Sequence, residues 1–164
     1  MQDLTEPVLE LIRFTSTDLP PDAEAALRTA MAGEAAGSAA RGALETILEN
    51  VALARAEATP ICQDTGTPLF FVRHPAGWST RQMTAQIRSA VAQATARAIL
   101  RPNAVDSLTG ANSGDNLGGA AFPSIHFEEV DGETLTMDLI LKGGGCENVG
   151  IQYSLPYTRR GAGR

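Results

Sequence analysis

Cys62, Gln63 and Asp64 lie side by side in the stretch "TPICQDTGTP" and place a thiol, an amide and a carboxylate at consecutive positions. A cysteine taken alone is more often a small buried hydrophobe than a metal ligand. Burying its two polar neighbours without partners would cost about 1–3 kcal/mol or more. We therefore expect something polar to face them, and the local residues leave a filler thiol and a reactive site both open.

The second cysteine, Cys146, follows three glycines in "LKGGGCEN". The two cysteines do not form a Cys-x-x-Cys spacing, so the local sequence holds no complete metal site. In the cytosolic setting that we expect, free thiols or metal ligands are favoured over a disulfide. The run Gly143–Gly145 is typical of a turn at the end of a strand. Its alternative role is to let backbone N–H groups beside Lys142 approach a carboxylate or a phosphate.

Arg101 follows an apolar helical segment and precedes a proline. A cation at the C-terminus of a helix interacts favourably with the helix dipole, which would explain this arginine without any ligand. The alternative is a planar donor that binds a substrate carboxylate through two parallel hydrogen bonds. His74 and His126 are the only histidines, too few for a His-rich metal site, and we assign neither a catalytic role.

The bulk composition excludes several classes of partner. The net charge is -6 and no segment gathers lysines and arginines, which argues against a nucleic-acid or anionic-membrane surface. The first residues mix acids with apolar residues, unlike a secretory signal or a membrane span. We expect a cytoplasmic protein that binds a small molecule or another protein, folded as one domain over residues 1–164.

Hydrophobic periodicity predicts the elements that must position these residues. We expect helices from Pro7 to about Phe14, from Pro21 to Gly33, over 39–58 and from Ser79 or Thr80 to Leu100, and strands over 68–74, 124–130 and 134–142. The third helix should bury one face that includes Ile47 and Leu53. Asp131-Gly132 between the last two strands predicts a β-hairpin. The predicted fold class is α+β, with N-terminal helices packed on a small, mainly antiparallel sheet.

The remaining segment, 101–123, is rich in Gly, Asn, Asp and Ser and shows no periodicity. Loops of this length inside a compact domain are usually functional or disordered. The Cys62 stretch falls where the third helix passes into the first strand, which is also a common place for functional loops.

Nearly the whole chain resembles the N-terminal part of the alpha subunit, or alpha region, of iron-sulfur hydro-lyases of the class I fumarase and tartrate dehydratase family. The resemblance rests on four segments in order, which are "RGALETILENVALARAEATPICQDTGTP", "LRPNAVDSLTGANSGDN", "PSIHF" and "LKGGGCENVG". Together they are far more specific than any one of them.

The resemblance implies a 4Fe-4S cluster held by three cysteines, with one iron left open as a Lewis acid toward the substrate oxygens. Cys62 matches the first cluster ligand. Gln63 and Asp64 match substrate contacts, and Asp64 is also the candidate for proton transfer. Arg101 matches the arginine that binds a substrate carboxylate, and Gly145 matches a backbone contact to substrate. Lys142 and Asn116 match weaker positions behind these contacts.

The family pattern often has serine where this chain has Cys146, so this residue need not be a ligand. The resemblance therefore implies that the other cluster cysteines lie downstream and that a beta subunit or beta region supplies the catalytic base, in a homo- or hetero-oligomer. We expect the chain to be the N-terminal part of a longer alpha subunit that hydrates or dehydrates a small dicarboxylic acid of the fumarate/malate or tartrate type. The alternative is a non-catalytic module for dicarboxylate binding or subunit assembly, without a cluster.

Overall fold

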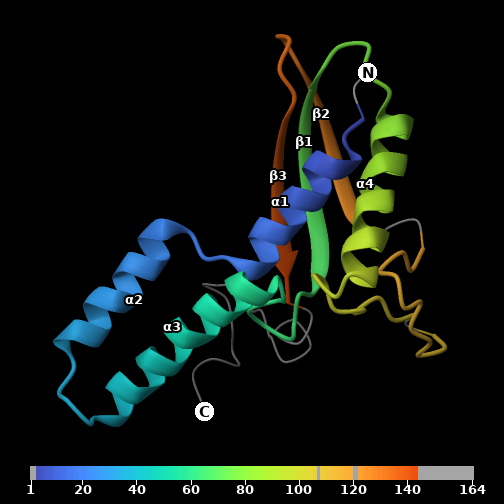
Figure 1. Cartoon of the computed structure of the whole chain (residues 1–164). Helices are drawn as coiled ribbons and strands as arrows, with labels where there is room; N and C mark the ends of the chain where they lie inside the picture. Colours follow the sequence, from blue (N-terminus) through green and yellow to red (C-terminus); the bar gives the residue numbers. More distant parts are fainter. Residues whose placement is uncertain (1–2, 107, 120–121, 144–164) are drawn as a thin grey trace, which may run out of the picture.

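The computed structural model describes residues 3–106, 108–119 and 122–143, and these form four helices and one three-stranded sheet. The helices are α1 (Thr5–Thr17), α2 (Pro21–Gly33), α3 (Ala39–Glu57) and α4 (Thr80–Ala96), and the strands are β1 (Thr67–Pro75), β2 (Ser124–Val130) and β3 (Thr136–Lys142). Figure 1 shows α1 and α4 beside the sheet, while α2 and α3 extend away from it as a helical hairpin. The predicted α+β class is confirmed.

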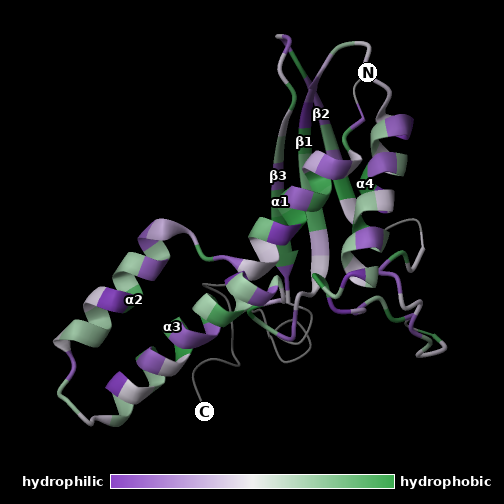
Figure 2. Cartoon of the chain, in the orientation of Figure 1, coloured by the Kyte–Doolittle hydropathy of each residue, from purple (hydrophilic) through white to green (hydrophobic). Residues whose placement is uncertain are grey.

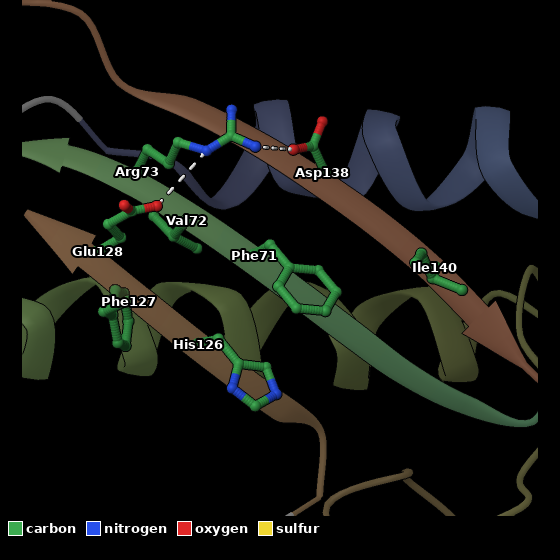
Figure 3. Close-up of a pocket in the computed structure, with 8 residues that line it drawn as sticks. All are labelled: Phe71, Val72, Arg73, His126, Phe127, Glu128, Asp138 and Ile140. Atoms are coloured by element: carbon green, nitrogen blue, oxygen red, sulfur yellow. Dashed lines mark hydrogen bonds and ion pairs between the residues drawn. The ribbon is translucent and has the colours of Figure 1, made fainter. Parts of the chain in front are cut away.

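The core lies between the sheet and one layer of helices. The face of α1 that carries Val8 and Ile12 meets the face of α4 that carries Met83 and Ile87, and both pack on the inward side of β1. These apolar side chains recur three or four positions apart, which places them on a single face of each helix. Figure 2 shows the hydrophobic residues gathered where these helices meet the strands. On the opposite face of the sheet Phe71 and Ile140 are 36% and 53% exposed, and Figure 3, which views this face, shows the helices behind the strands.

Serine residues set the starts of two helices. Ser38 accepts a hydrogen bond from the N–H of Arg41 at the start of α3, and Ser79 accepts one from the N–H of Gln82 at the start of α4. These side-chain acceptors satisfy N–H groups that have no partner within the helix. Both starts agree with the sequence prediction.

The end of α4 differs from the prediction, because the helix stops at Ala96 instead of Leu100. Ala98 adopts a left-handed conformation with φ of 59°, and the N–H groups of Ile99 and Leu100 both donate to the carbonyl of Ala94. This turn directs both side chains into the core, where they are 7% and 1% exposed. Arg101 therefore begins a loop instead of ending a helix, which weakens its interpretation as a simple partner of the helix dipole.

The sheet has the strand order β2-β1-β3, so the predicted hairpin between β2 and β3 is wrong. The strand β1 lies between them, parallel to β2 and antiparallel to β3, and the sheet is mixed instead of mainly antiparallel. The burial of the strands explains why β1 takes the central position. A central strand is covered on both edges, and β1 carries the most deeply buried strand residues, including Phe70 and Val72. The connection over 131–135 is long enough to pass over one strand, a distance of about 10 Å.

The helical hairpin is attached to the body mainly through the end of α3. The helix α2 carries no buried residue, and α3 buries only Leu48, Val51 and Ala54. The predicted face of α3 is wrong in part, since Ile47 is 44% and Leu53 is 59% exposed. Figure 2 shows hydrophilic residues along the whole length of both helices.

Arg55 ties the base of this helical hairpin. It forms ion pairs with Asp18, just after α1, and with Glu24 in α2, the latter at 2.8 Å. These contacts lower the pKa of Glu24, mainly through the hydrogen bond from Arg55. In the described part of the chain no helix has the length and apolarity that a membrane crossing requires.

Candidate functional site

The sheet register brings two of the sequence motifs together. Thr67, the first residue of β1, lies opposite Lys142, the last residue of β3, so the "CQDTG" loop and the start of "KGGG" meet at one end of the sheet. Gly66 makes this approach possible. It has φ of +60°, and a Cβ placed on it would lie 1.6 Å from the carbonyl oxygen of Lys142, so only glycine fits.

A second close approach involves Asp64. A Cβ built on Gly143 would lie 2.9 Å from Oδ2 of Asp64, which places this carboxylate directly against the first glycine of the triple-glycine run. The structure therefore brings the candidate proton-transfer residue to the predicted backbone site. Gly145, like Cys146, lies outside the described residues, so its predicted substrate contact stays a prediction.

Gln63 and Arg101 line the same open hollow, of about 530 Å³. Both side chains are exposed to solvent. The remaining lining comes from the end of α4 and the turn after it, and consists of Thr95, Ala98, Leu100, Pro102 and Asn103. The hollow thus combines a guanidinium, two side-chain amides and a few apolar side chains, which is a suitable lining for a small anion with a carbon skeleton.

Cys62 and Asp64 line a neighbouring, smaller hollow of about 190 Å³. Its other wall is formed by Thr65, Ile61 and Leu141 together with residues at the end of α1 and just beyond it, which are Thr15, Ser16, Asp18 and Leu19. The four predicted residues that the structure describes therefore divide into two pairs in adjacent hollows. The chain bends over residues 61–63, and the side chain of Gln63 lines the other hollow from those of Cys62 and Asp64.

Side-chain hydrogen bonds connect the two hollows. Oγ1 of Thr65 accepts from the N–H of Arg101 at 3.2 Å and from Nδ2 of Asn103 at 3.1 Å. Nδ2 of Asn116 donates to the carbonyl of Arg101 at 2.7 Å and to Oγ1 of Thr95 at 3.0 Å. Both peptide groups that flank the Arg101 side chain are therefore held by side chains from other parts of the chain.

Asn116 is 1% exposed and has φ of +59°, a conformation that asparagine adopts more readily than most residues. Its Oδ1 accepts from the N–H groups of Asn103 and Ala104, at 2.7 and 3.1 Å. From the sequence, Asn116 is only a weaker candidate, and neither Thr65 nor Asn103 has a predicted role. The signal that could have found Thr65 is its position within "CQDTG", where a hydroxyl stands one residue from the candidate proton-transfer carboxylate.

Further turns of the 101–119 loop are ordered by aspartates. Oδ1 of Asp106 accepts from the N–H groups of Leu108 and Thr109 and from the Thr109 hydroxyl. The N–H of Thr109 makes the largest contribution to lowering the pKa of Asp106. The pKa of Asp115 is also lowered, first by the N–H of Leu117. Both carboxylates are therefore ionised at neutral pH, which is the form that accepts these hydrogen bonds.

Another hollow, of about 370 Å³, lies on the open face of the sheet (Figure 3). There the rings of Phe71 and His126 stack with centroids 5.0 Å apart. Arg73 bridges Glu128 and Asp138 on the two outer strands, as the dashed lines in Figure 3 show. This hollow contains none of the predicted site residues, and it lies on the face turned away from α1 and α4.

A family model described as "Fumarate hydratase (Fumerase)" matches residues 5–162, nearly the whole chain. The chain belongs to this fumarate hydratase family. The matched range contains every residue predicted for the site, from Cys62 to Gly145.

Relatives with two kinds of name match the chain. A putative fumarate hydratase class I of Geobacillus stearothermophilus is 49% identical over 164 residues, which cover 100% of this chain and 32% of that protein. A putative L(+)-tartrate dehydratase subunit alpha of Methanocaldococcus jannaschii is 31% identical over 89% of this chain and 52% of that subunit. The L(+)-tartrate dehydratase subunit alpha of Escherichia coli K12 is 30% identical over 87% of this chain and 47% of that subunit. The chain thus spans between a third and about half of the length of these relatives.

The resemblance of the chain to iron-sulfur members of the fumarate hydratase family raises the question of whether the described residues fit such a cluster. Cys62 is a free, exposed thiol beside a hollow, which suits one ligand of a metal cluster. Within the described ranges no three His, Cys, Asp or Glu side chains gather as a metal site. The described residues therefore fit one ligand position, and they do not form a cluster site by themselves.

Proposed function

We propose that the chain is the part of a hydro-lyase that binds one side of a small dicarboxylic acid of the fumarate/malate or tartrate type. Membership of the fumarate hydratase family and the names of the relatives support this reaction class. The observation that carries the assignment of residues is that Gln63 and Arg101, which are 38 positions apart in sequence, line one hollow next to the Asp64 loop.

In this proposal each exposed side chain has a chemical role. Arg101 binds one substrate carboxylate, because its planar guanidinium presents two parallel N–H donors to the two oxygens. Gln63 donates from its amide to a second substrate oxygen and accepts from the substrate hydroxyl. Asp64 donates a proton to the departing hydroxyl group, takes one from water in the reverse direction, or orients that hydroxyl, as a carboxyl group within reach of a reacting group can do.

We further propose that Cys62 is one thiolate ligand of a 4Fe-4S cluster whose other ligands come from outside the described residues. When bound, the cluster would supply Lewis-acid assistance to the departure or addition of the hydroxyl group. A beta subunit or beta region is the proposed source of the remaining substrate contacts, since the chain matches subunits named alpha over about half of their length.

A binding experiment tests the substrate assignment. The chain is titrated with fumarate, L-malate and L-tartrate by calorimetry, with propionate as a monocarboxylate control. Arg101→Ala should weaken dicarboxylate binding by about 1.5–3 kcal/mol, the range for hydrogen bonds to charged groups. Arg97→Ala is the matched control, because Arg97 is also an exposed arginine near the end of α4 but pairs with Gln93 outside the hollow. Equal binding by both variants would reject the role of Arg101.

Iron analysis tests the role of Cys62 separately. After anaerobic reconstitution with iron and sulfide, in the presence of the beta partner, Cys62→Ser should lower the iron content and the absorbance of the cluster relative to the wild type. Unchanged iron and turnover would reject the ligand assignment. Iron near zero in the wild type, together with dicarboxylate binding that depends on Arg101, would favour the alternative of a binding module without a cluster.

A further inference from the structure

Arg101 presents a contrast between its side chain and its main chain. The side chain is exposed at the rim of the larger hollow, whereas its main chain is held on both sides by buried groups. The N–H of Arg101 donates to Thr65, which is 5% exposed, and the carbonyl accepts from Asn116, which is 1% exposed. The two side chains that bind this peptide segment are distant in sequence, at 36 and 15 positions from Arg101.

The location of Thr65 gives this arrangement a consequence for the site. Thr65 lines the smaller hollow together with Cys62 and Asp64, and its hydroxyl oxygen accepts from the N–H of Arg101 beside the larger hollow. One hydroxyl group therefore fixes the separation between the loop of Cys62 and the arginine. Asn103, which lines the larger hollow, donates to the same oxygen from its side chain.

Asn116 fixes the other end of the same segment. Its amide group makes four hydrogen bonds, with Oδ1 accepting from two N–H groups after Arg101 and Nδ2 donating to the carbonyl of Arg101 and to Thr95 in α4. The arginine loop is thereby attached to the last turn of a core helix. A long arginine side chain loses less entropy on binding when its base is already fixed, so this support improves recognition of a carboxylate.

We propose that Thr65 and Asn116 are positioning residues that act through Arg101 and set its distance from the Cys62 loop. The inference rests on the proposed function, in which Arg101 binds a substrate carboxylate. Neither Thr65 nor Asn116 needs to touch the substrate. Their effect on substrate affinity is transmitted through the main chain of Arg101. A substitution at Thr65 or Asn116 should therefore change the affinity only when the Arg101 side chain is present.

The first measurement is hydrogen exchange of the Arg101 amide by NMR in the full chain. In the wild type this amide should exchange slowly, because it is bound to a buried oxygen. Thr65→Val removes the acceptor at nearly constant volume and should accelerate the exchange of this amide, while Thr65→Ser should retain the protection. Thr29→Val is the matched control, because Thr29 bonds only within the exposed helix α2. Unchanged exchange in Thr65→Val overturns the inference whether or not a ligand binds.

The second measurement is a double-mutant cycle for L-malate affinity. Thr65→Val should weaken binding by about tenfold in the wild-type background, the order expected for one misplaced charge-assisted contact. In the Arg101→Ala background, which keeps the N–H, the same substitution should have no effect on affinity. An equal loss in both backgrounds overturns the inference, because it means that Thr65 acts on the fold as a whole.

Asn116→Asp provides the independent variant. It keeps an oxygen acceptor for the N–H groups of Asn103 and Ala104 but removes the donor to the carbonyl of Arg101 and to Thr95. The loss of L-malate affinity in Asn116→Asp should again require the Arg101 side chain. An equal loss in the Arg101→Ala background overturns the role of Asn116. If the wild type binds none of the dicarboxylates, the proposed function fails, and the exchange measurement still decides whether Thr65 holds Arg101.

Discussion

Gly66→Ala is the substitution for which the structure makes the strongest prediction. Gly66 has φ of +60°, and the added Cβ would lie 1.6 Å from the carbonyl oxygen of Lys142 and 2.2 Å from its carbonyl carbon. These atoms belong to the backbone at the end of β3, so no side-chain rotation can relieve the contact. Either the "CQDTG" loop or the strand end must move.

Two costs contribute to the expected loss of stability. An alanine in the left-handed conformation costs about 1–2 kcal/mol relative to glycine. Displacing packed backbone adds about 1–3 kcal/mol, the usual range for overpacking. Gly37→Ala separates the two costs, because Gly37 has φ of +78° but a Cβ there would meet no atom within 4 Å. Gly66→Ala should therefore lower the free energy of unfolding by about 2–5 kcal/mol and Gly37→Ala by only about 1–2 kcal/mol.

The assay is urea unfolding followed by far-UV circular dichroism, with the free energies compared at equal m-values. Nearly equal losses in the two variants would refute the close approach of the loop to β3. A second readout concerns the site. The substitution should also change the NMR signals of Asp64 and Gly143, which lie in contact across this junction, while Gly37→Ala should leave them unchanged.

Three further predictions follow from the same structure. Gly42→Ala should raise the free energy of unfolding by about 0.5–1 kcal/mol. Gly42 lies in the exposed first turns of α3, where a Cβ would meet no atom within 4 Å. A lower free energy in urea unfolding would contradict its helical assignment. Ile87→Ala in the core should lower the free energy of unfolding by about 2–5 kcal/mol. Ile47→Ala, at a 44% exposed position, should change it by no more than about 0.5 kcal/mol. Equal losses would support the buried face of α3 that was predicted from sequence. The carboxyl of Asp106 should titrate below its usual pKa of 3.8 in NMR. The hydrogen bonds to ionised Asp106 stabilise the folded loop above pH 3.8, and this stabilisation is lost as the pH falls through the lower pKa of the folded state. Thr109→Val removes the hydroxyl donor to Asp106 and should move the titration midpoint back toward 3.8.

The helices could be predicted well wherever the sequence contains local stop and start signals. Pro21 and Gly33 mark both ends of α2, and the predicted bounds agree with the structure. The end of α4 has no such signal, because Ala98 takes a left-handed conformation that alanine does not normally favour. The apolar side chains of Ile99 and Leu100 determine this turn through their burial, and burial is a property of the tertiary structure.

The candidate site was predicted in its residue types but not in its arrangement. The stretch of Cys62, Gln63 and Asp64 is recognisable because polar groups stand next to a cysteine at a helix-to-strand junction. Their division between two hollows depends on the path of the loop, which periodicity does not describe. The support of Arg101 by Thr65 joins positions 36 apart, and nothing in either local sequence indicates the pairing.

The largest error in the sequence prediction, the hairpin of β2 and β3, concerns the feature that assembles the site. In a hairpin, the end of β3 would lie beside the start of β2, near Ser124. In the structure β3 instead pairs antiparallel with β1, and this pairing places Lys142 opposite Thr67. The triple-glycine run therefore begins beside the "CQDTG" loop, with Gly143 against Asp64. The two motifs meet because β1 inserts between strands that are neighbours in sequence, and a local turn signal such as Asp131-Gly132 cannot encode that insertion.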